Sequence, residues 1–344
     1  MTGPDVTGPP GGAALPDVAA VAIGRNEGAR LLDCLASLRD GGAARVVYVD
    51  SGSTDGSAEA ARAQGAEVVA LDMGMPFTAA RARNAGLARL AGGTDAAGRP
   101  AAGGAAVPPY VQFVDADCVL RPGWIATARA FLDAHPAAAV ACGRRRERFP
   151  EASVWNAMID AEWDTPVGQT RACGGDALMR TAPLLSVGGY DPSLIAGEEP
   201  ELCLRLRATG WEIWRLDAEM TLHDAALLHL GQWWQRARRA GYSYAEGAAM
   251  HGRPPERHCV TELSRALAWG LALPVATLVG LAATPWAGLL LLAWPAQVLR
   301  LRARGMPWSR AAFLTLGKLP EAQGALTWAW RRARRAGPRL IEYK

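Results

Sequence analysis

Residues 110–117 read Tyr-Val-Gln-Phe-Val-Asp-Ala-Asp, an apolar run that ends in two carboxylates. The run Tyr110–Val114 predicts a buried β-strand. Asp115 and Asp117 are two residues apart in an extended segment, so their side chains point to the same side. Two carboxylates placed in this way can share one hard cation such as Mg²⁺ or Mn²⁺, which prefers oxygen ligands and commonly bridges substrate phosphates. The plainer interpretation is a pair of surface turn carboxylates, because the D-x-D pattern is common.

The residues around this strand alternate between strand patterns and helix patterns. Further strands are predicted at Val18–Ile23, Arg45–Val49 and Glu67–Leu71, and helices at Ala29–Leu38, Gly56–Gln64, Thr78–Ala91 and Trp124–Leu132. Such alternation indicates an α/β fold with a parallel sheet and helices on both of its faces. In open α/β sheets, ligands bind beyond the carboxyl ends of the strands, which is where Asp115 and Asp117 fall.

A second polar segment, Asp50-Ser-Gly-Ser-Thr-Asp-Gly56, also follows a predicted strand and opens a helix. Ser53, Thr54 and Asp55 are good N-cap residues, so a capped strand-to-helix turn explains them. That interpretation explains Asp50 less well, because a carboxylate at the end of a buried strand needs a partner. A nucleotide base or a ribose is one partner that would satisfy it.

A third acidic segment, Gly197-Glu-Glu-Pro-Glu-Leu202, precedes a predicted helix. Proline near the start of a helix and glutamate in its first turn are common at helix N-termini, and this preference accounts for Pro200 and Glu201. It leaves Glu198 and Glu199 unexplained. Adjacent carboxylates in a cleft can include a general base with a raised pKa.

The length and composition fit one α/β domain and an accessory region, or two domains. The chain has 344 residues, a net charge of +4 and six cysteines without a C-x-x-C pair, which fits reduced thiols and not a disulfide framework or a zinc site. Residues 1–16 are rich in Gly and Pro and show no secretory pattern, so we expect a disordered tail there.

The composition changes in the last third of the chain. Ala266–Leu299 is a run of 34 residues without Asp, Glu, Lys or Arg, and Thr284-Pro285-Trp286 interrupts it near the middle. One straight helix of that length would reach ~51 Å, well beyond a ~30 Å hydrocarbon core, so two short helices joined by a turn are predicted. Trp308–Arg335 mixes aromatic, aliphatic and basic residues, which is typical of a helix lying in a membrane interface.

Six segments occur in one order between about residues 18 and 247 and resemble those of the family 2 glycosyltransferases with the GT-A fold. They are Ala22–Glu27, Val47–Ser57, the A-R-N-x-G helix at Ala82–Gly86, the aspartate motif with Pro-Gly-Trp at Phe113–Trp124, the G-G…V-G-G-F-D pattern between Gly174 and Asp191, and the G-E-D-x-E-L motif at Gly197–Leu206. The resemblance implies a doubly wound mixed sheet. It also implies an inverting enzyme of hexosyltransferase type that uses a UDP-, GDP- or dTDP-sugar and Mg²⁺ or Mn²⁺.

On the donor side, the resemblance assigns a role to each matching residue. Asn26 and Glu27 end the first strand of the family, and Glu27 and Asp50 would contact the nucleoside. Arg83 would lie near the base or the diphosphate. Asp115 would face both the ribose and the metal.

On the reaction side, Asp117 would bind the metal, and Glu199 falls on the last acidic residue of the G-E-D motif, the catalytic base of the family. His223 falls where related enzymes often carry a histidine near the diphosphate or the metal, although a structural histidine is the plainer interpretation. Two residues depart from the family pattern: Ser51 replaces an aspartate, and Glu199 replaces the usual aspartate. Glu199 can act if its loop lies further back; otherwise Glu198 takes the role, or activity is lost.

These expectations leave two rival interpretations open. One is a membrane scaffold that kept the GT-A fold and lost its chemistry, which the two departures would explain. The other is a nucleotidyltransferase, but such enzymes open with a Gly-rich loop and a lysine, both of which Arg25–Gly28 lacks.

The expected organisation is a GT-A domain at residues 17–250, an apolar membrane-associated helical hairpin at 260–300, and a basic amphipathic interfacial helix and tail at 301–344. Arginines flank the apolar run on both sides, and the positive-inside tendency places such flanks in the cytoplasm. We therefore expect a re-entrant hairpin or a short pair of spans in the inner (cytoplasmic) membrane, with the catalytic domain facing the cytoplasm. The alternative is a buried hairpin in a soluble protein. The expected acceptor is a glycan or a lipid-linked glycan of the cell envelope, and no nucleic-acid partner is expected.

Overall fold

The computed structural model describes residues 14–93, 107–335 and 341, and the chain divides into two compact units. The first unit takes the residues up to 149, Ile159–Ser193 and Glu198–Ala225. The second unit takes Pro150–Met158, Leu194–Gly197 and the residues from 226 onward. The main division therefore falls near residue 225, about one long helix earlier than the boundary expected near residue 250. Most of the expected N-terminal tail lies outside the described residues, although its last two residues open the first strand.

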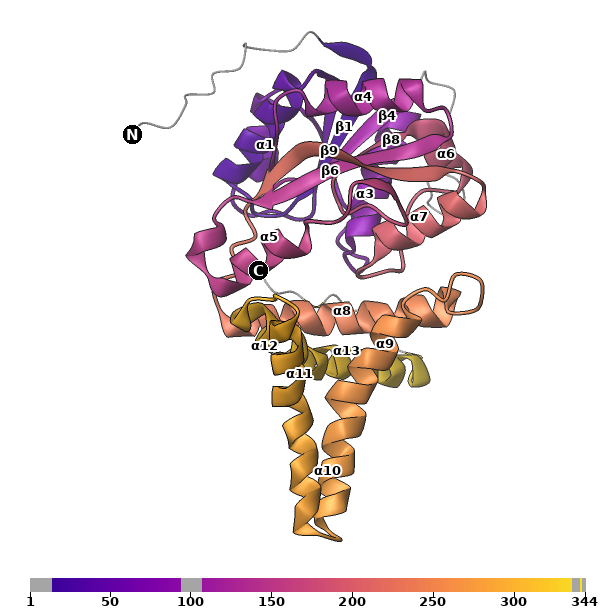
Figure 1. The fold of residues 1–344 in the computed structure, drawn as a ribbon. Coiled ribbons are helices and arrows are strands. Elements are labelled where there is room, and N and C mark those ends of the chain that lie inside the picture. The colour runs from indigo at the N-terminus through magenta and orange to yellow at the C-terminus, as the bar shows by residue number, and fades with distance from the viewer. Residues whose placement is uncertain (1–13, 94–106, 336–340, 342–344) are drawn as a thin grey trace. The chain divides into compact units, whose positions relative to one another are not determined.

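The first unit contains a mixed sheet that has nine strands within the described residues (Figure 1). The strands are β1 (Leu15–Gly24), β2 (Ala43–Asp50), β3 (Glu67–Ala70), β4 (Tyr110–Asp115), β5 (Cys118–Leu120), β6 (Ala138–Glu147), β7 (Gly168–Thr170), β8 (Ala177–Arg180) and β9 (Glu212–His223). Their order is β3-β2-β1-β4-β8-β6-β9-β5, with β7 paired to β9. Strands β3, β2, β1 and β4 are parallel, and β8 returns antiparallel to β4.

Helices with one apolar stripe cover this sheet. They are α1 (Ala29–Asp40), α2 (Ser57–Ala63), α3 (Ala79–Ala91), α4 (Trp124–Ala134), α6 (Thr181–Ser186) and α7 (Glu198–Ala208). Helix α1 buries Leu31, Cys34, Leu35 and Leu38, the i, i+3, i+4, i+7 spacing of a helix with one face on a core. Each predicted strand and helix before residue 135 matches an observed element within a few residues, and the fold class is confirmed.

The second unit is helical. It begins with the short 3₁₀ helix Pro150–Ala152 and the first turns of α5 (Val154–Glu162). Its two long helices, α8 (Leu230–His251) and α13 (Lys318–Ala333), lie side by side (Figure 1). These two helices approach closely because glycines lie at their contact. A Cβ on Gly241 would lie 1.9 Å from the Glu321 carbonyl oxygen, and a Cβ on Gly324 would lie 1.9 Å from the Arg238 carbonyl oxygen.

A helical hairpin leaves this pair, as predicted. Its first arm is continuous through α9 (Val260–Leu267), a π-helical turn (Ala268–Ala272) and α10 (Leu273–Leu281). Its second arm is a 3₁₀ helix, η3 (Pro285–Leu292), followed by α11 (Ala293–Ala303). Among the described residues, the first arm, Val260–Leu281, is the one helix that is long and apolar enough to cross a membrane.

The C-terminal stretch differs from the prediction, because Trp308–Arg335 forms two helices in place of one. Helix α12 (Trp308–Leu316) ends at Gly317, and α13 begins at Lys318. Pro320 explains the break. It has no N–H to bond the carbonyl of Leu316, and its ring would clash with that carbonyl in a continuous helix.

Candidate active site

The site forms where the parallel strands β1, β2 and β4 end. Asp50 is paired in register with Gly24, and Asp115 is paired with Ile23. The chain order therefore brings three loops to one edge of the sheet, at the carboxyl ends of the strands. This is the place where open α/β sheets bind their ligands.

Asp50 finds its partners within its own turn. Its Oδ2 accepts hydrogen bonds from the backbone N–H groups of Gly52 (3.1 Å) and Ser53 (3.0 Å), and its Oδ1 accepts from the Tyr48 hydroxyl (3.2 Å). The turn thus satisfies the carboxylate that the sequence analysis left without a partner. The next side chain differs, because the Ser51 hydroxyl is buried and has no hydrogen-bond partner among the described residues.

Asn26 joins the loops that follow β1 and β2. Its backbone N–H donates to Ser53 Oγ (2.9 Å), and its side-chain oxygen accepts from the Thr54 backbone N–H (2.7 Å). The next residue, Glu27, forms an ion pair with Arg30 at 2.8 Å. Asn26 therefore links the loops that follow β1 and β2, and the Glu27 carboxylate is held by the first turn of α1.

Arg83 lies at the centre of the acidic residues. Its guanidinium, 3% exposed, forms ion pairs with Asp115 Oδ1 (2.9 Å), Glu198 Oε1 (2.8 Å) and Glu199 Oε1 (2.8 Å). The guanidinium also lies 5.6 Å from the centroid of the Tyr190 ring. One buried arginine therefore joins the end of β4 to the first turn of α7, and neither the sequence motif nor the spacing revealed that link.

Two of the three carboxyl groups that pair with Arg83, those of Glu199 and Asp115, have opposite pKa shifts. Burial, together with the neighbouring Glu198, raises the pKa of Glu199 to about 7, although Arg83 opposes the shift. Burial would also raise the pKa of Asp115, but Arg83 and Arg145 outweigh it and lower that pKa to about 2. A group poised near neutral pH suits general-base chemistry, whereas Asp115 stays ionised.

The site contains two further residues that the sequence analysis did not single out. Arg145, on β6, donates to Asp115 Oδ2 (2.8 Å) and to both oxygens of Asp176 (2.8 and 2.9 Å). Asp176 is buried, accepts from Thr221 Oγ1 (2.7 Å) and takes the backbone N–H of Asp115 (3.2 Å). Arg145 lies in the run Arg144-Arg145-Arg146. In a strand, the middle residue of such a run points to the opposite face from its two neighbours, and this alternation could have singled it out. Asp176 follows the Gly174-Gly175 pair that was recognised.

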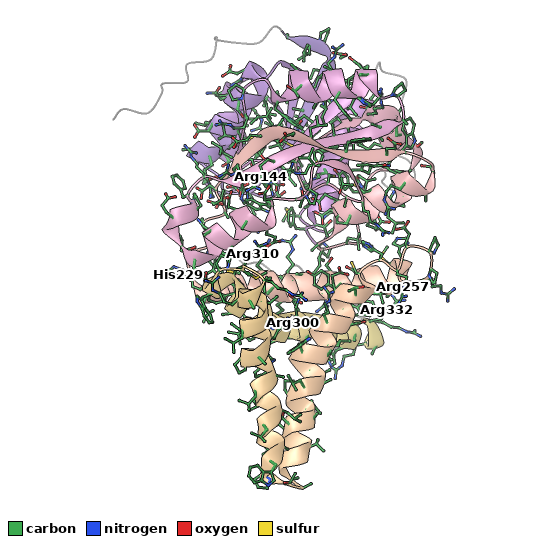
Figure 2. The ribbon with its side chains drawn as sticks, in the orientation of Figure 1. Arg144, His229, Arg257, Arg300, Arg310 and Arg332 are labelled. Carbon is green, nitrogen blue, oxygen red and sulfur yellow. The ribbon has the colours of Figure 1, made fainter. Side chains whose placement is uncertain are left out.

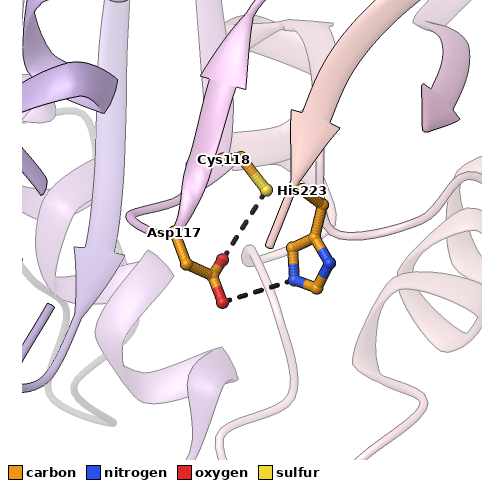
Figure 3. A group of neighbouring side chains, drawn as sticks. All are labelled: Asp117, Cys118 and His223. Carbon is orange, nitrogen blue, oxygen red and sulfur yellow. Dashed lines mark hydrogen bonds and ion pairs between the residues drawn. The ribbon is translucent and has the colours of Figure 1, made fainter. Parts of the chain in front are cut away.

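A second cluster lies where β5 begins and β9 ends and contains Asp117, Cys118 and His223 (Figure 3). Asp117 Oδ2 lies 3.3 Å from His223 Nε2, and Asp117 Oδ1 accepts from the Cys118 thiol at 3.7 Å. The other ring nitrogen of His223, Nδ1, lies 3.8 Å from Glu147 Oε2. The fold therefore brings together Asp117 and His223, which are 106 residues apart (223 − 117).

This cluster fits a hard divalent cation. Adjacent ligands of an octahedral ion with bonds of about 2.1 Å lie about 3.0 Å apart, close to the 3.3 Å between Asp117 Oδ2 and His223 Nε2. Cys118 is a poor ligand for such an ion, because hard divalent cations prefer oxygen ligands to thiolate sulfur. The other three-ligand group, Asp115, Cys118 and Asp176, already contains the guanidinium of Arg145.

Gly175 lets the backbone pass between these groups. A Cβ at this position would lie 2.7 Å from Arg83 Nη2, 3.1 Å from Asp115 Oδ2 and 3.3 Å from Glu199 Oε1. The neighbouring Gly174 has no atom within 4 Å of such a Cβ. The second glycine of the pair is therefore the one that the arrangement of Arg83, Asp115 and Glu199 requires.

The chain is similar to known glycosyltransferases in sequence and in fold. Residues 21–175 match the model of the family described as glycosyl transferase family 2. The chain is 30% identical over 209 residues to the succinoglycan biosynthesis protein ExoA of Rhizobium meliloti (strain 1021). That alignment covers 60% of this chain and 60% of the relative, so the chain spans less than two thirds of the length of that protein.

The fold is similar to that of a solved mannosyltransferase, PcManGT from Pyrobaculum calidifontis, whose structure is in complex with GDP-Man and Mn²⁺. The TM-score is 0.62 at 21% sequence identity, over 94% of this chain and 90% of that one. At this identity the likeness concerns the fold. Residues 21–175 therefore match glycosyl transferase family 2, and the chain has the GT-A fold.

Proposed function

We propose that the protein transfers one sugar at a time from a nucleotide-diphosphate donor to an acceptor hydroxyl, with inversion at the anomeric carbon. The observation that carries the proposal is the position of Glu199. Its half-buried carboxyl group lies in the first turn of α7 and shares Arg83 with Asp115, and desolvation together with Glu198 raises its pKa to about 7. Glu199 would therefore act as a base at the carboxyl ends of the sheet strands, with a substantial ionised fraction at neutral pH.

The reaction that fits this geometry is a single displacement. Ionised Glu199 accepts the proton of the acceptor hydroxyl while that oxygen attacks the anomeric carbon. The bond between this carbon and the diphosphate oxygen breaks on the opposite face, and the nucleoside diphosphate leaves with the electron pair. Arg83 holds Glu199 in place, and the ionised Asp115 and the loops around Asp50 receive the donor.

The donor requires positive charge near its diphosphate, and the acidic site does not supply enough. Arg83 and Arg145 form ion pairs with the carboxyl groups of Asp115, Asp176, Glu198 and Glu199, and a fifth carboxyl group, that of Asp117, lies beside His223. We propose that Asp117 and His223 hold Mg²⁺ or Mn²⁺, which when bound neutralises charge on the leaving diphosphate. Glu147 lies on the far side of the His223 ring and is placed to orient it.

The proposed setting is the cytoplasmic membrane. Residues 230–335 contain fifteen Lys or Arg and four Glu, a net charge of +11 (15 − 4), whereas the whole chain has +4. Figure 2 shows Arg257, Arg300 and Arg332 at the end of the hairpin away from its turn. An apolar hairpin with a basic end fits an anionic membrane surface. Cytoplasmic basic flanks keep the catalytic domain with the nucleotide-sugar pool, and a glycan or lipid-linked glycan of the cell envelope is the proposed acceptor.

A screen of the purified protein with UDP-, GDP- and dTDP-sugars tests the proposal, with release of nucleoside diphosphate as the readout. We expect release from one class of donor in Mn²⁺ or Mg²⁺, and loss of release in EDTA. The departure at Glu199 motivates one alternative, a GT-A scaffold without activity. Donor binding without turnover of any donor, in the presence of membrane extracts as an acceptor source, would favour that alternative and overturn the proposal.

A further inference from the structure

The two arms of the hairpin have almost the same length along their axes. The uncharged part of the first arm, Ala266–Leu281, has 16 residues and extends about 24 Å at about 1.5 Å per residue. The uncharged part of the second arm, Pro285–Leu299, has 15 residues. As an α-helix it would extend only about 22 Å.

The 3₁₀ helix lengthens the second arm. The eight residues of η3 extend about 16 Å at a rise of about 2.0 Å, and the next seven α-helical residues add about 10 Å. Each arm therefore reaches about 24–26 Å before its turn, nearly the ~30 Å of a hydrocarbon core and well beyond the ~15 Å of one leaflet. A 3₁₀ run of eight residues is unusually long, since runs beyond 3–4 residues are uncommon.

The turn between the arms carries groups that a bilayer centre does not accept. Ala283 and Thr284 donate their N–H groups to the Gly280 carbonyl, and Thr284 Oγ1 accepts from the Trp286 N–H at 3.4 Å. The last carbonyls of a helix nevertheless lack intrahelical partners, and hydrocarbon offers no water to satisfy them. Trp286 is 75% exposed, and tryptophan concentrates at the membrane–water interface.

The surfaces of the arms match a lipid environment. Leu278 and Val279 on the first arm are 70% and 68% exposed, and Leu289 and Leu292 on the second arm are 56% and 59% exposed. Near the turn the arms meet through small residues, because a Cβ on Gly280 would lie 2.6 Å from the Cβ of Ala287. Close contact through small residues is the usual way in which helices associate in a bilayer.

We infer that the hairpin crosses the whole bilayer and does not re-enter the leaflet from which it starts. In this arrangement Thr284 and Trp286 lie in the headgroup region of the far leaflet, and Arg265 and Arg300 lie in that of the near leaflet. The inference rests on the membrane attachment proposed above, and it adds that a short segment of the chain is exposed on the opposite face of the membrane.

Cysteine labelling in intact cells tests this inference on the full-length protein. The native cysteines should give little background labelling, because five of the six are buried. Cys259, the half-buried one, can be replaced by serine. Ala283→Cys places a thiol at the turn, and Arg302→Cys places one on the basic flank as the matched control. Both are treated with a membrane-impermeant maleimide before and after permeabilisation, and the protein is then denatured to count every reactive thiol.

We expect Ala283→Cys to be labelled in intact cells to the extent seen after permeabilisation, and Arg302→Cys only after permeabilisation. Protection of Ala283→Cys from both sides until denaturation would show a re-entrant hairpin and overturn the inference. Labelling of both positions only after permeabilisation would overturn it as well. Carbonate extraction and donor turnover of the same membranes separate this failure from failure of the proposed function: release by carbonate refutes the attachment, whereas retained turnover supports the enzyme in either case.

Discussion

The substitution Gly175→Ala gives a sharp test of the arrangement around Arg83. The new Cβ would lie 2.7 Å from Arg83 Nη2, whereas ordinary contact begins at 3.4 Å, so the guanidinium must withdraw by 0.7 Å (3.4 − 2.7). The bond from Nη2 to Asp115 Oδ1 is 2.9 Å. A withdrawal of that size directed away from Asp115 would lengthen it to about 3.6 Å, beyond hydrogen-bond range.

We expect the altered guanidinium position to displace Glu199, and a misplacement near 1 Å can reduce turnover about 10²-fold. Loss of one charge-assisted bond lowers the free energy of unfolding by about 1.5–3 kcal/mol. The assay is nucleoside diphosphate release, combined with thermal unfolding. Gly174→Ala is the matched control, because its Cβ meets no atom within 4 Å, and both quantities should stay at the wild-type level. Equal turnover in the two variants would refute the reasoning.

Three further predictions concern the metal, the base and the second unit. Asp117→Asn should abolish the Mn²⁺ dependence of donor binding in calorimetry, with little change in melting temperature; donor turnover by this variant in EDTA at the wild-type rate would exclude the metal site. Because only ionised Glu199 accepts a proton and its pKa is raised to about 7, turnover should fall about tenfold per pH unit below 7 and level off above it; a rate profile flat from pH 5 to 8 would disagree. Gly241→Ala, which brings a Cβ to 1.9 Å from a backbone oxygen of α13, should cost about 1–3 kcal/mol of unfolding free energy, whereas Gly231→Ala on the same helix, with open space around its Cβ, should cost none.

The sequence predicted the elements of the first half of the sheet well, because apolar runs and helical spacing there are local. It also predicted the helical hairpin. An uncharged run of 34 residues is too long for one straight membrane helix, and Thr284-Pro285 interrupts it near the middle. The break at Gly317 was missed, because the basic and aromatic pattern continues through it. The effect of Pro320 on the preceding turn was the available signal.

The contacts within the site depend on strand order, which sequence spacing does not reveal. β8 and β6 follow β4 in the sheet, and this order brings Asp176 and Arg145 to Asp115. The carboxylates were visible as motifs. Arg83 was expected near the base or the diphosphate and not between Asp115 and Glu199, and Arg145 was not singled out. The shared use of Arg83 by Glu198 and Glu199 likewise arises from packing, so the sequence left the choice of base open.

The most direct test of the proposed chemistry compares two single-atom changes at neighbouring positions. Glu199→Gln and Glu198→Gln are assayed with the donor that the wild-type protein turns over, and donor binding is measured for each. Glu199→Gln should bind the donor nearly as the wild type does and lose roughly 10²–10⁴-fold in turnover, the range expected for a general base. Glu198→Gln should lose less, since its carboxylate acts on the site indirectly, through its ion pair with Arg83 and through its charge beside Glu199. Wild-type turnover by Glu199→Gln would contradict the assignment of the base, and with it the proposed mechanism.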